Sequence, residues 1–301
     1  MEMDQFVLFG DSLTQQSFAQ THTFAFGAAL ADTYARKLDV LNRGLNGYNT
    51  LQALRALSLC MPEPEHSRVR FLLIFFGAND ARLAHSPGGP DQYVSVADFA
   101  SNVRGMVEHP AVRAHEGVKI ILVTTPPVDE RRAHQADRDK YPALGANELR
   151  RTAANTALYA QAVRDLGVEL QLPVLDIWTA MVSRAGYSRT SPPPVIGSRE
   201  APANETLQSF LHDGLHFTGE GYKILFGELM ALIERTWPEE MPARLPMRLP
   251  PWDDPRTWHQ EGQGRRMDGG GERGVDGDGG GGALRARGKF EAVIRDVKKV
   301  D

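Results

Sequence analysis

Short, uninterrupted runs of apolar residues punctuate this chain, and they limit the folds that it can adopt. The clearest is residues 6–9, FVLF, which ends abruptly at Gly10. An apolar run of this length without polar alternation is typical of a strand buried on both faces, as in a parallel sheet. The expected strands are residues 6–9, 39–41, 69–76, 118–124 and 173–177.

Segments compatible with helices alternate with these strands. They cover residues 17–36, 51–59, 96–108 and 146–166, and a further one follows at 219–235. Strands that alternate with helices predict βαβ units and a parallel sheet covered on both faces. We therefore expect an α/β fold, a three-layer α/β/α sandwich with a five-stranded parallel sheet and right-handed crossovers.

Composition excludes several classes of protein. The 301 residues carry a net charge of −4, and Lys and Arg (34) are scattered and outnumbered by Asp and Glu (38), so no nucleic-acid partner is expected. A single cysteine, Cys60, rules out an internal disulfide and suits a reducing compartment. No stretch approaches the roughly 18–20 apolar residues of a membrane span, and the N-terminus lacks the features of a signal peptide. We expect a cytoplasmic protein, with a small homo-oligomer as an open option.

The end of the chain differs from the rest. Residues 238–255 contain six prolines in eighteen positions, which excludes a regular helix or a central strand. Residues 262–282 contain eleven glycines in twenty-one positions, too many for a packed structure. We expect a folded domain at 1–240, a Pro-rich strap at 241–260, a Gly-rich disordered linker at 261–288 and a short basic, helix-compatible tail at 289–301. The Gly-rich segment is either a flexible spacer or an artefact of the gene model.

Polar motifs follow the expected strands and precede the last helix. They are GDS at 10–12, NRGLNGY at 42–48, GAND at 77–80 and HDGLH at 212–216. Open α/β sheets bind ligands at the carboxyl ends of their strands, where such motifs would meet. Each has a simpler explanation by itself: Ser12 could cap a helix, GAND could be a turn, and Asp213 and His216 could belong to a surface loop. Their joint occurrence at one edge of one sheet favours a catalytic site.

Acyl transfer needs the groups that these motifs supply. A serine hydroxyl such as that of Ser12 becomes a good nucleophile when a base, here His216, removes its proton. Asp213 would hold the imidazole in the right tautomer, a task that a backbone carbonyl could share. The tetrahedral intermediate needs preorganised donors, and the backbone N–H groups of Ser12 and Gly47 and the side-chain amide of Asn79 are available.

At these residues the chain resembles the SGNH (GDSL) hydrolase family. The four blocks Gly10-Asp11-Ser12-Leu13, Gly47, Gly77-Ala78-Asn79-Asp80 and Asp213-Gly214-Leu215-His216 occur in order, and the match spans residues 5 to about 235. The resemblance implies that Ser12 is the nucleophile, that Gly47 and Asn79 complete the oxyanion hole, and that Asp213 and His216 complete the triad.

Further residues are similar to the isoamyl-acetate-hydrolysing esterase branch of that family. They are NRGLNGY at 42–48, GANDA at 77–81, PPVDE at 126–130, Arg151, Thr152 and Asn155, and DGLHFT at 213–218. This similarity implies a serine esterase that releases acetate from esters of small alcohols, without a metal or organic cofactor. The segment between Gly186 and Phe210, which contains TSPPP, is an addition, and a loop there would reshape the substrate pocket.

Other functions stay open at this point. A thioesterase, a lysophospholipase or a carbohydrate deacetylase would use the same five residues. His212 and His216, with Asp213 between them, have the spacing of metal ligands on a helix, although Gly214 disfavours a helix there. An inert hydrolase core could instead serve as an interaction protein that presents Ser191-Pro192-Pro193-Pro194 as a polyproline II ligand.

Overall fold

The computed structural model describes residues 3–21, 23–89 and 91–254. The chain divides into two compact units, residues 1–245 and residues 246–301. Every helix and strand named below belongs to the first unit. The predicted linker at 261–288 and tail at 289–301 lie outside the described residues, as does the end of the predicted strap.

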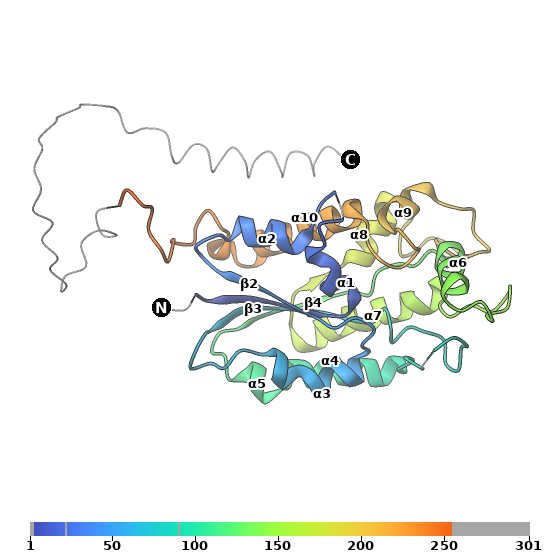
Figure 1. Cartoon of the computed structure of the whole chain (residues 1–301), viewed down its shortest axis with the longest axis horizontal. Helices are drawn as coiled ribbons and strands as arrows, with labels where there is room; N and C mark the ends of the chain where they lie inside the picture. The colour runs from blue at the N-terminus through green and yellow to red at the C-terminus, as the bar shows by residue number, and fades with distance from the viewer. Residues whose placement is uncertain (1–2, 22, 90, 255–301) are drawn as a thin grey trace, which may run out of the picture. The chain divides into compact units, whose positions relative to one another are not determined.

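A five-stranded parallel sheet forms the centre of the first unit, as predicted (Figure 1). Its strands are β1 Gln5–Gly10, β2 Asp39–Gly44, β3 Val69–Phe75, β4 Lys119–Val123 and β5 Val174–Leu175. They lie in the order β2-β1-β3-β4-β5, and every neighbouring pair is parallel. Since the chain order reverses beside β1, a crevice is expected at the carboxyl ends of β1 and β3.

Helices cover both faces of this sheet. The helices are α1 Ser12–Gln15, α2 Phe26–Thr33, α3 Thr50–Cys60, α4 Val96–Glu108, α5 Pro110–Arg113, α6 Glu130–Lys140, α7 Ala153–Leu170, α8 Ile177–Arg184, α9 Glu205–Phe210 and α10 Gly219–Thr236, with 3-10 turns η1 Gln16–Phe18 and η2 Pro238–Glu240. Helices α3, α4 and α7 lie on one side of the sheet, and α2, α8 and α10 lie on the other (Figure 1). This is the predicted three-layer α/β/α sandwich.

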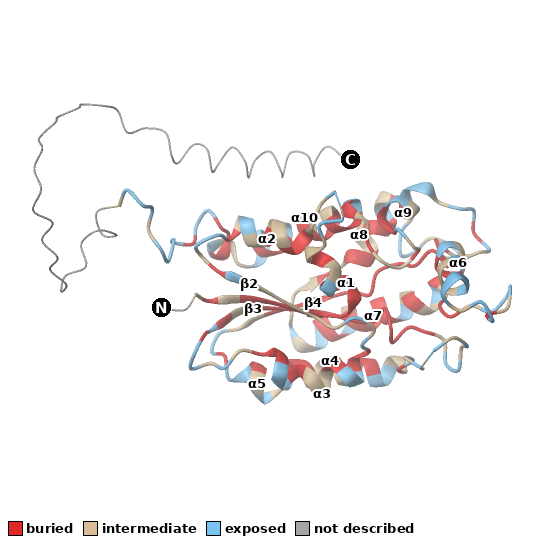
Figure 2. Cartoon of the chain, viewed as in Figure 1, coloured by how far each residue is buried: buried red, intermediate tan, exposed pale blue. Residues whose placement is uncertain are grey.

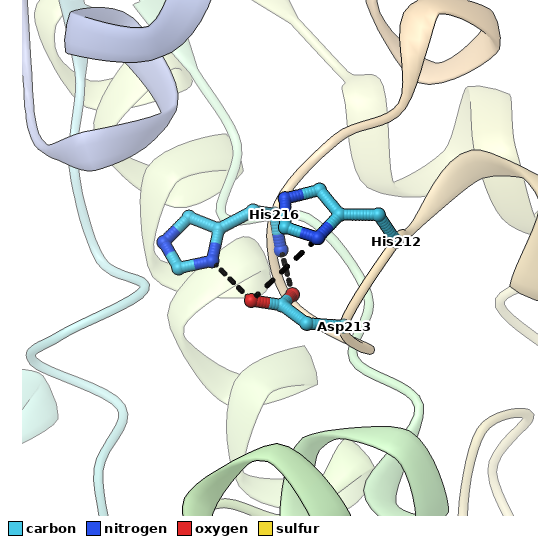
Figure 3. Close-up of side chains that lie close together, drawn as sticks. All are labelled: His212, Asp213 and His216. Atoms are coloured by element: carbon cyan, nitrogen blue, oxygen red, sulfur yellow. Dashed lines mark hydrogen bonds and ion pairs between the residues drawn. The ribbon is translucent and has the colours of Figure 1, made fainter. Parts of the chain in front are cut away.

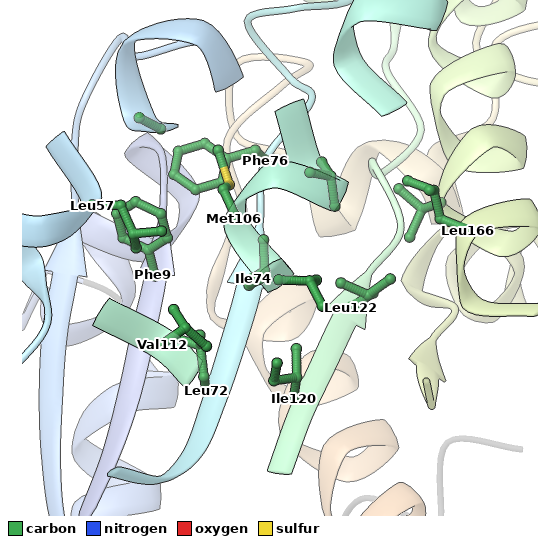
Figure 4. Close-up of a cluster of buried hydrophobic side chains, with 14 of the residues drawn as sticks. Phe9, Leu57, Leu72, Ile74, Phe76, Met106, Val112, Ile120, Leu122 and Leu166 are labelled. Atoms are coloured by element: carbon green, nitrogen blue, oxygen red, sulfur yellow. The ribbon is translucent and has the colours of Figure 1, made fainter. Parts of the chain in front are cut away.

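Side chains from alternate strand positions fill the two interfaces between sheet and helices. On one face, Phe9 and Ile74 pack with residues of α3, α4 and α7, including Leu57 and Met106 (Figure 4). On the other face, the ring of Phe6 stacks on that of Phe71 at a centroid distance of 4.7 Å. Strands β1, β3 and β4 are buried from both sides (Figure 2), which explains why their sequences are apolar without alternation, whereas β2 is only partly buried.

The expected single helix at 17–36 is wrong. The chain forms α1 and η1, residues 19–21 and 23–25 are not helical, and α2 begins at Phe26. The interrupted segment packs against the first turn of α10, where a Cβ on Gly219 would lie 2.3 Å from Thr23 Oγ1 and 2.8 Å from Phe24 N. This tertiary contact outweighs the helix propensity of the local sequence.

The expected helix at 146–166 also begins too early. Helix α7 starts at Ala153 because the Thr152 side chain caps it, accepting a hydrogen bond from the Asn155 N–H. Helix α6, Glu130–Lys140, was not predicted: its sequence ERRAHQADRDK offers too few apolar residues for a helical stripe. Both changes matter because residues of α6 and of the segment before α7 line the site described below.

The 3-10 turn η2 and residues 241–245 form the end of the first unit. The carboxylate of Glu240 is buried and forms ion pairs with Arg70 at 2.6 Å and with Lys119 at 2.7 Å. Met241 and Leu245 are buried as well. Within the described residues, none of the helices combines the length and apolar character needed to cross a membrane.

Candidate active site

Ser12 lies in a tight turn at the carboxyl end of β1. A Cβ on Gly10 would lie 2.0 Å from Thr14 Oγ1 and 2.5 Å from Phe75 O, so only glycine fits before the turn. Asp11 is the N-cap of α1, and its Oδ1 accepts a 2.9 Å hydrogen bond from the Leu13 N–H. The alternative that Ser12 caps the helix is therefore wrong, since Asp11 has that task. The Ser12 hydroxyl is available for another partner.

That partner is His216, which belongs to a short loop before α10. An antiparallel bridge between Leu211 and Phe217 closes the loop, and the His212 N–H donates to His216 O at 2.9 Å. The loop holds the imidazole so that Nε2 of His216 lies 2.9 Å from Oγ of Ser12. This hydrogen bond joins the turn after β1 to the loop before α10, although Ser12 and His216 are more than 200 positions apart in the sequence.

Asp213 holds the other side of the same imidazole (Figure 3). Its Oδ2 lies 2.6 Å from His216 Nδ1, and its Oδ1 accepts hydrogen bonds from the backbone N–H groups of His216 and Leu215. Burial by itself raises the pKa of Asp213, but the hydrogen bonds and the nearby imidazole outweigh burial and lower that pKa below the usual value. An ionised Asp213 favours the tautomer with a proton on Nδ1 and a lone pair on Nε2 facing Ser12.

Gly47 and Asn79 come from the loops that follow β2 and β3. Gly47 has a φ of +81°, a conformation that side chains rarely adopt, and Asn79 lies in the turn after β3. Both line one cavity of about 500 Å³ together with Ser12, Asp213 and His216. The structure therefore brings together all five residues that the sequence singled out.

Asp11 of the GDS motif and Asp80 of the GAND motif are buried carboxylates, and sequence reasoning assigned neither of them a role. Burial raises the pKa of Asp11 to about 7 and that of Asp80 to about 6. Asp80 Oδ1 accepts hydrogen bonds from the backbone N–H and the hydroxyl of Thr50. Within the described part of the chain, the second oxygen of each carboxylate has no hydrogen-bond partner.

Two further residues of the site were missed for different reasons. Gln92 donates to Asn79 Oδ1 at 3.2 Å from a segment without helix or strand, where the sequence has no periodic signal. Arg151 donates to the same oxygen at 3.3 Å. Arg151 was among the residues similar to the isoamyl-acetate-hydrolysing branch, and that similarity was a signal without an assigned role.

His212, Asp213 and His216 form a cluster of potential metal ligands (Figure 3). The ligand atoms of the three residues lie within 4.8 Å of one another. The cluster is on a loop, so the helical spacing considered above does not apply. Both ring nitrogens of His216 already bind Ser12 and Asp213, and a cation could coordinate His216 only by breaking one of these bonds.

None of residues 187–210 lines the cavity, and an effect of this loop on the pocket stays a prediction. The loop packs on the start of α6, where Arg131 donates to the carbonyl oxygens of Ser198, Arg199 and Ala201. Residues of helix α6 and of the segment after it line the cavity instead. A larger hollow of about 740 Å³ lies elsewhere, beside the amino end of β1, and contains none of the five residues.

Comparisons with known proteins show what the chain is similar to. Residues 8–224 match the model of the GDSL-like lipase/acylhydrolase family. The chain is 36% identical to a GDSL esterase/lipase of Arabidopsis thaliana, over 80% of this chain and 91% of the relative. It is 32% identical to the isoamyl acetate-hydrolyzing esterase of Saccharomyces cerevisiae, over 84% and 96%. A crystal structure of a lipase/acylhydrolase from Enterococcus faecalis superposes with a TM-score of 0.52 at 27% identity, covering 82% of this chain and all of that one.

Proposed function

The chain belongs to the GDSL-like lipase/acylhydrolase family and is an ester hydrolase, and on this basis we propose that Ser12, His216 and Asp213 are its catalytic triad. The observation that carries the proposal is the continuous chain of hydrogen bonds from Ser12 Oγ through both ring nitrogens of His216 to Asp213 Oδ2. A nucleophile, a base and a group that orients the base are the parts that covalent acyl transfer requires.

The reaction begins with attack of Ser12 Oγ on the carbonyl carbon of the ester. His216 Nε2 takes the hydroxyl proton as the bond forms, and Asp213 stabilises the resulting imidazolium. His216 then gives the proton to the leaving alcohol, and the acyl group stays on Ser12. In the second half His216 removes a proton from a water molecule, whose oxygen bonds to the acyl carbon. The bond between that carbon and Ser12 Oγ then breaks, His216 returns the proton to Ser12 Oγ, and the acid leaves.

The negative oxygen of the tetrahedral intermediate would lie among three donors. These are the backbone N–H groups of Ser12 and Gly47 and the side-chain amide of Asn79. Ser12 is the first residue of α1, so its N–H has no acceptor within the helix. Donors that are fixed before the reaction stabilise the developing charge without reorganisation, which is often the largest contribution to catalysis.

The substrate that we propose is a short-chain ester, of the acetate type, of a small alcohol. Support comes from the yeast relative, an isoamyl acetate-hydrolyzing esterase that is 32% identical to this chain over 96% of the relative's length. The cavity of about 500 Å³ lies within the usual range for small-molecule sites and has room for such an ester.

A second candidate is an ester whose alcohol carries hydroxyl groups, as in a carbohydrate deacetylase. The cavity favours it because charged and amide side chains outnumber apolar ones in the lining, among them Asp91, Gln92, Asp137 and Lys140. A branched aliphatic alcohol forms no hydrogen bonds with a polar lining, whereas the hydroxyl groups of a sugar can donate to it and accept from it.

Both candidates are tested by measuring kcat/KM for isoamyl acetate, an acetylated monosaccharide and the butyrate and octanoate esters of isoamyl alcohol. Each substrate is given to the wild type and to Ser12→Ala, with folding checked by circular dichroism. A short-chain esterase prefers acetate over octanoate and loses activity with Ser12→Ala on every substrate. A preference for the acetylated sugar selects the second candidate, and equal rates for the two proteins contradict the proposed nucleophile.

A further inference from the structure

The side-chain amide of Asn79 has two possible orientations that have nearly the same shape. In one, Nδ2 faces the cavity and can donate to a negative oxygen; in the other, Oδ1 faces the cavity and repels it. An amide oxygen accepts while its nitrogen donates, so the neighbours of the amide decide which orientation is stable. The structure shows which neighbours these are.

Gln92 is the first of them. Its Nε2 lies 3.2 Å from Asn79 Oδ1 and 2.7 Å from the backbone oxygen of Gly47. One NH₂ group thus donates to both of the loops that supply the oxyanion donors after β2 and β3. Gln92 is itself anchored, because its backbone oxygen accepts a 3.0 Å hydrogen bond from Asn49 Nδ2.

Arg151 is the second neighbour and approaches from within the protein. Its Nη2 lies 3.3 Å from Asn79 Oδ1, and its Nε donates to the backbone oxygen of Ala78 at 2.9 Å. The guanidinium is buried, which lowers its pKa to about 10, so it still carries its charge at neutral pH. A cation bound to the amide oxygen polarises the amide and makes its N–H a stronger donor.

Together the two donors leave one orientation for Asn79. Oδ1 receives hydrogen bonds from Gln92 and Arg151, and Nδ2 uses one hydrogen on Tyr48 O at 2.9 Å. Within the described residues, the second hydrogen of Asn79 Nδ2 has no acceptor. Rotating the amide by half a turn would set its NH₂ against two donors and lose all three bonds.

The segment that carries Arg151 is tied to the same loop at two further points. The backbone oxygen of Arg150 accepts a 2.7 Å bond from the Leu83 N–H, and Asn155 Nδ2 donates to Ala81 O at 2.8 Å. The sequence singled out three residues of this segment without a role. Thr152 caps α7, and Arg151 and Asn155 hold the loop that carries Asn79.

We propose that Gln92 and Arg151 are positioning residues of the oxyanion hole: by donating to Asn79 Oδ1 they hold the Asn79 N–H toward the reacting carbonyl, and Gln92 also fixes the loop of Gly47. The inference rests on the proposed function, because it assigns a role in forming the oxyanion site. Neither residue touches the reacting atoms in this account. Both act through Asn79.

Gln92→Leu tests the first half, since leucine has a similar size but no donor and Gln92 is only half-buried, so the variant should fold. We expect kcat for an activated acetate ester to fall about 10- to 100-fold with KM changed less than about threefold, because the lost interaction strengthens only in the transition state. Gln161→Leu is the matched control: Gln161 is exposed on α7 and bonds Asp165, and its replacement should leave kcat unchanged.

A double-mutant cycle shows whether the effect passes through Asn79. In an Asn79→Ala background, Gln92→Leu should cost less than about threefold, the remainder being its contact with Gly47. Arg151→Lys and Arg151→Met test the second half. Lysine keeps the charge, so kcat should fall less in Arg151→Lys than in Arg151→Met. Thermal melting of each variant gives the temperature at which both are equally folded, and kcat is compared there.

Several results would overturn the inference. One is a Gln92→Leu enzyme whose kcat stays within about twofold of the wild type; another is a rise in KM at unchanged kcat, which would make Gln92 a substrate contact. An equal loss in the presence and absence of the Asn79 side chain would show that Gln92 acts elsewhere. If the wild type has no Ser12-dependent activity, the proposed function itself fails and the inference fails with it.

Discussion

Asp213 Oδ2 lies 2.6 Å from Nδ1 of His216, while Asp213 Oδ1 accepts hydrogen bonds from the backbone N–H groups of His216 and Leu215. One carboxylate thus fixes both the ring of the histidine and the turn of the loop that carries it. The close spacing of the two residues in the sequence makes this possible, because Gly214 between them adopts a φ of +84°. A Cβ on Gly214 would lie 2.5 Å from Asp129 O.

Asp213→Asn should lower kcat by about 10³- to 10⁴-fold while KM changes little. An asparagine can present its NH₂ group to Nδ1, which favours the tautomer with the proton on Nε2 and removes the base from Ser12. Steady-state kinetics on an activated acetate ester measures this, with circular dichroism to confirm folding. Near-full activity of Asp213→Asn and of Asp213→Ala would remove Asp213 from the triad.

The activity should fall on the acid side of a pH profile. Protonated His216 has no lone pair on Nε2 and cannot accept the Ser12 proton. The pKa of Asp213 is held well below its usual value, so Asp213 stays ionised where histidines titrate and contributes no second acid limb there. A kcat/KM profile should therefore rise from about pH 5 to about pH 8 as His216 loses its proton. A flat profile would argue against a histidine base.

Gly47→Ala should impair catalysis far more than it impairs stability. The φ of +81° costs an alanine about 1 kcal/mol or more, and the backbone change moves the N–H that faces the oxyanion. Gly186→Ala is a matched control, since Gly186 has the same φ of +81° and open space around its Cβ position. Both variants should lose similar amounts of melting temperature, but only Gly47→Ala should lose about 10²-fold in kcat. Equal activities of the two variants would show that Gly47 has no catalytic role.

Asp11→Asn should change how stability depends on pH. Burial raises the folded-state pKa of Asp11 to about 7 from an ordinary value of 3.8. Between these values the folded protein binds more protons than the unfolded chain, so Asp11 lowers stability as the pH rises and contributes nothing below about pH 4. Each unit of pKa difference is worth about 1.4 kcal/mol. Asparagine keeps the acceptor for the Leu13 N–H without the charge.

The variant should therefore gain stability over the wild type progressively from about pH 4 to about pH 7, as measured by urea unfolding at several pH values. Asp80, whose pKa is also raised, is present in both proteins, so the difference between them reports Asp11. A difference that does not change with pH would mean that Asp11 is ionised in the folded protein throughout this range.

The fold was predictable because β1, β3 and β4 are buried on both faces, and apolar runs such as residues 69–76 reveal that burial directly. The five site residues were predictable because they follow strand ends or precede the last helix, where local motifs mark turns. The break in the helix at 17–36 was not predictable, since it depends on packing against Gly219, about 200 positions away. Gln92 was missed and Arg151 was singled out without a role, because the role of each lies in its contact with Asn79 and not in any local pattern. Cytoplasmic location, the absence of a nucleic-acid partner and a small homo-oligomer stay predictions of the sequence.

The account depends most on Ser12 as a nucleophile that His216 activates, and covalent labelling tests this directly. A fluorophosphonate that mimics an ester should form one adduct per chain, and mass spectrometry of the digested protein should place it on the peptide that contains Ser12. His216→Ala should slow labelling by at least about 10²-fold. An adduct on another residue, or an enzyme that hydrolyses acetate esters yet forms no adduct at Ser12, would contradict the account.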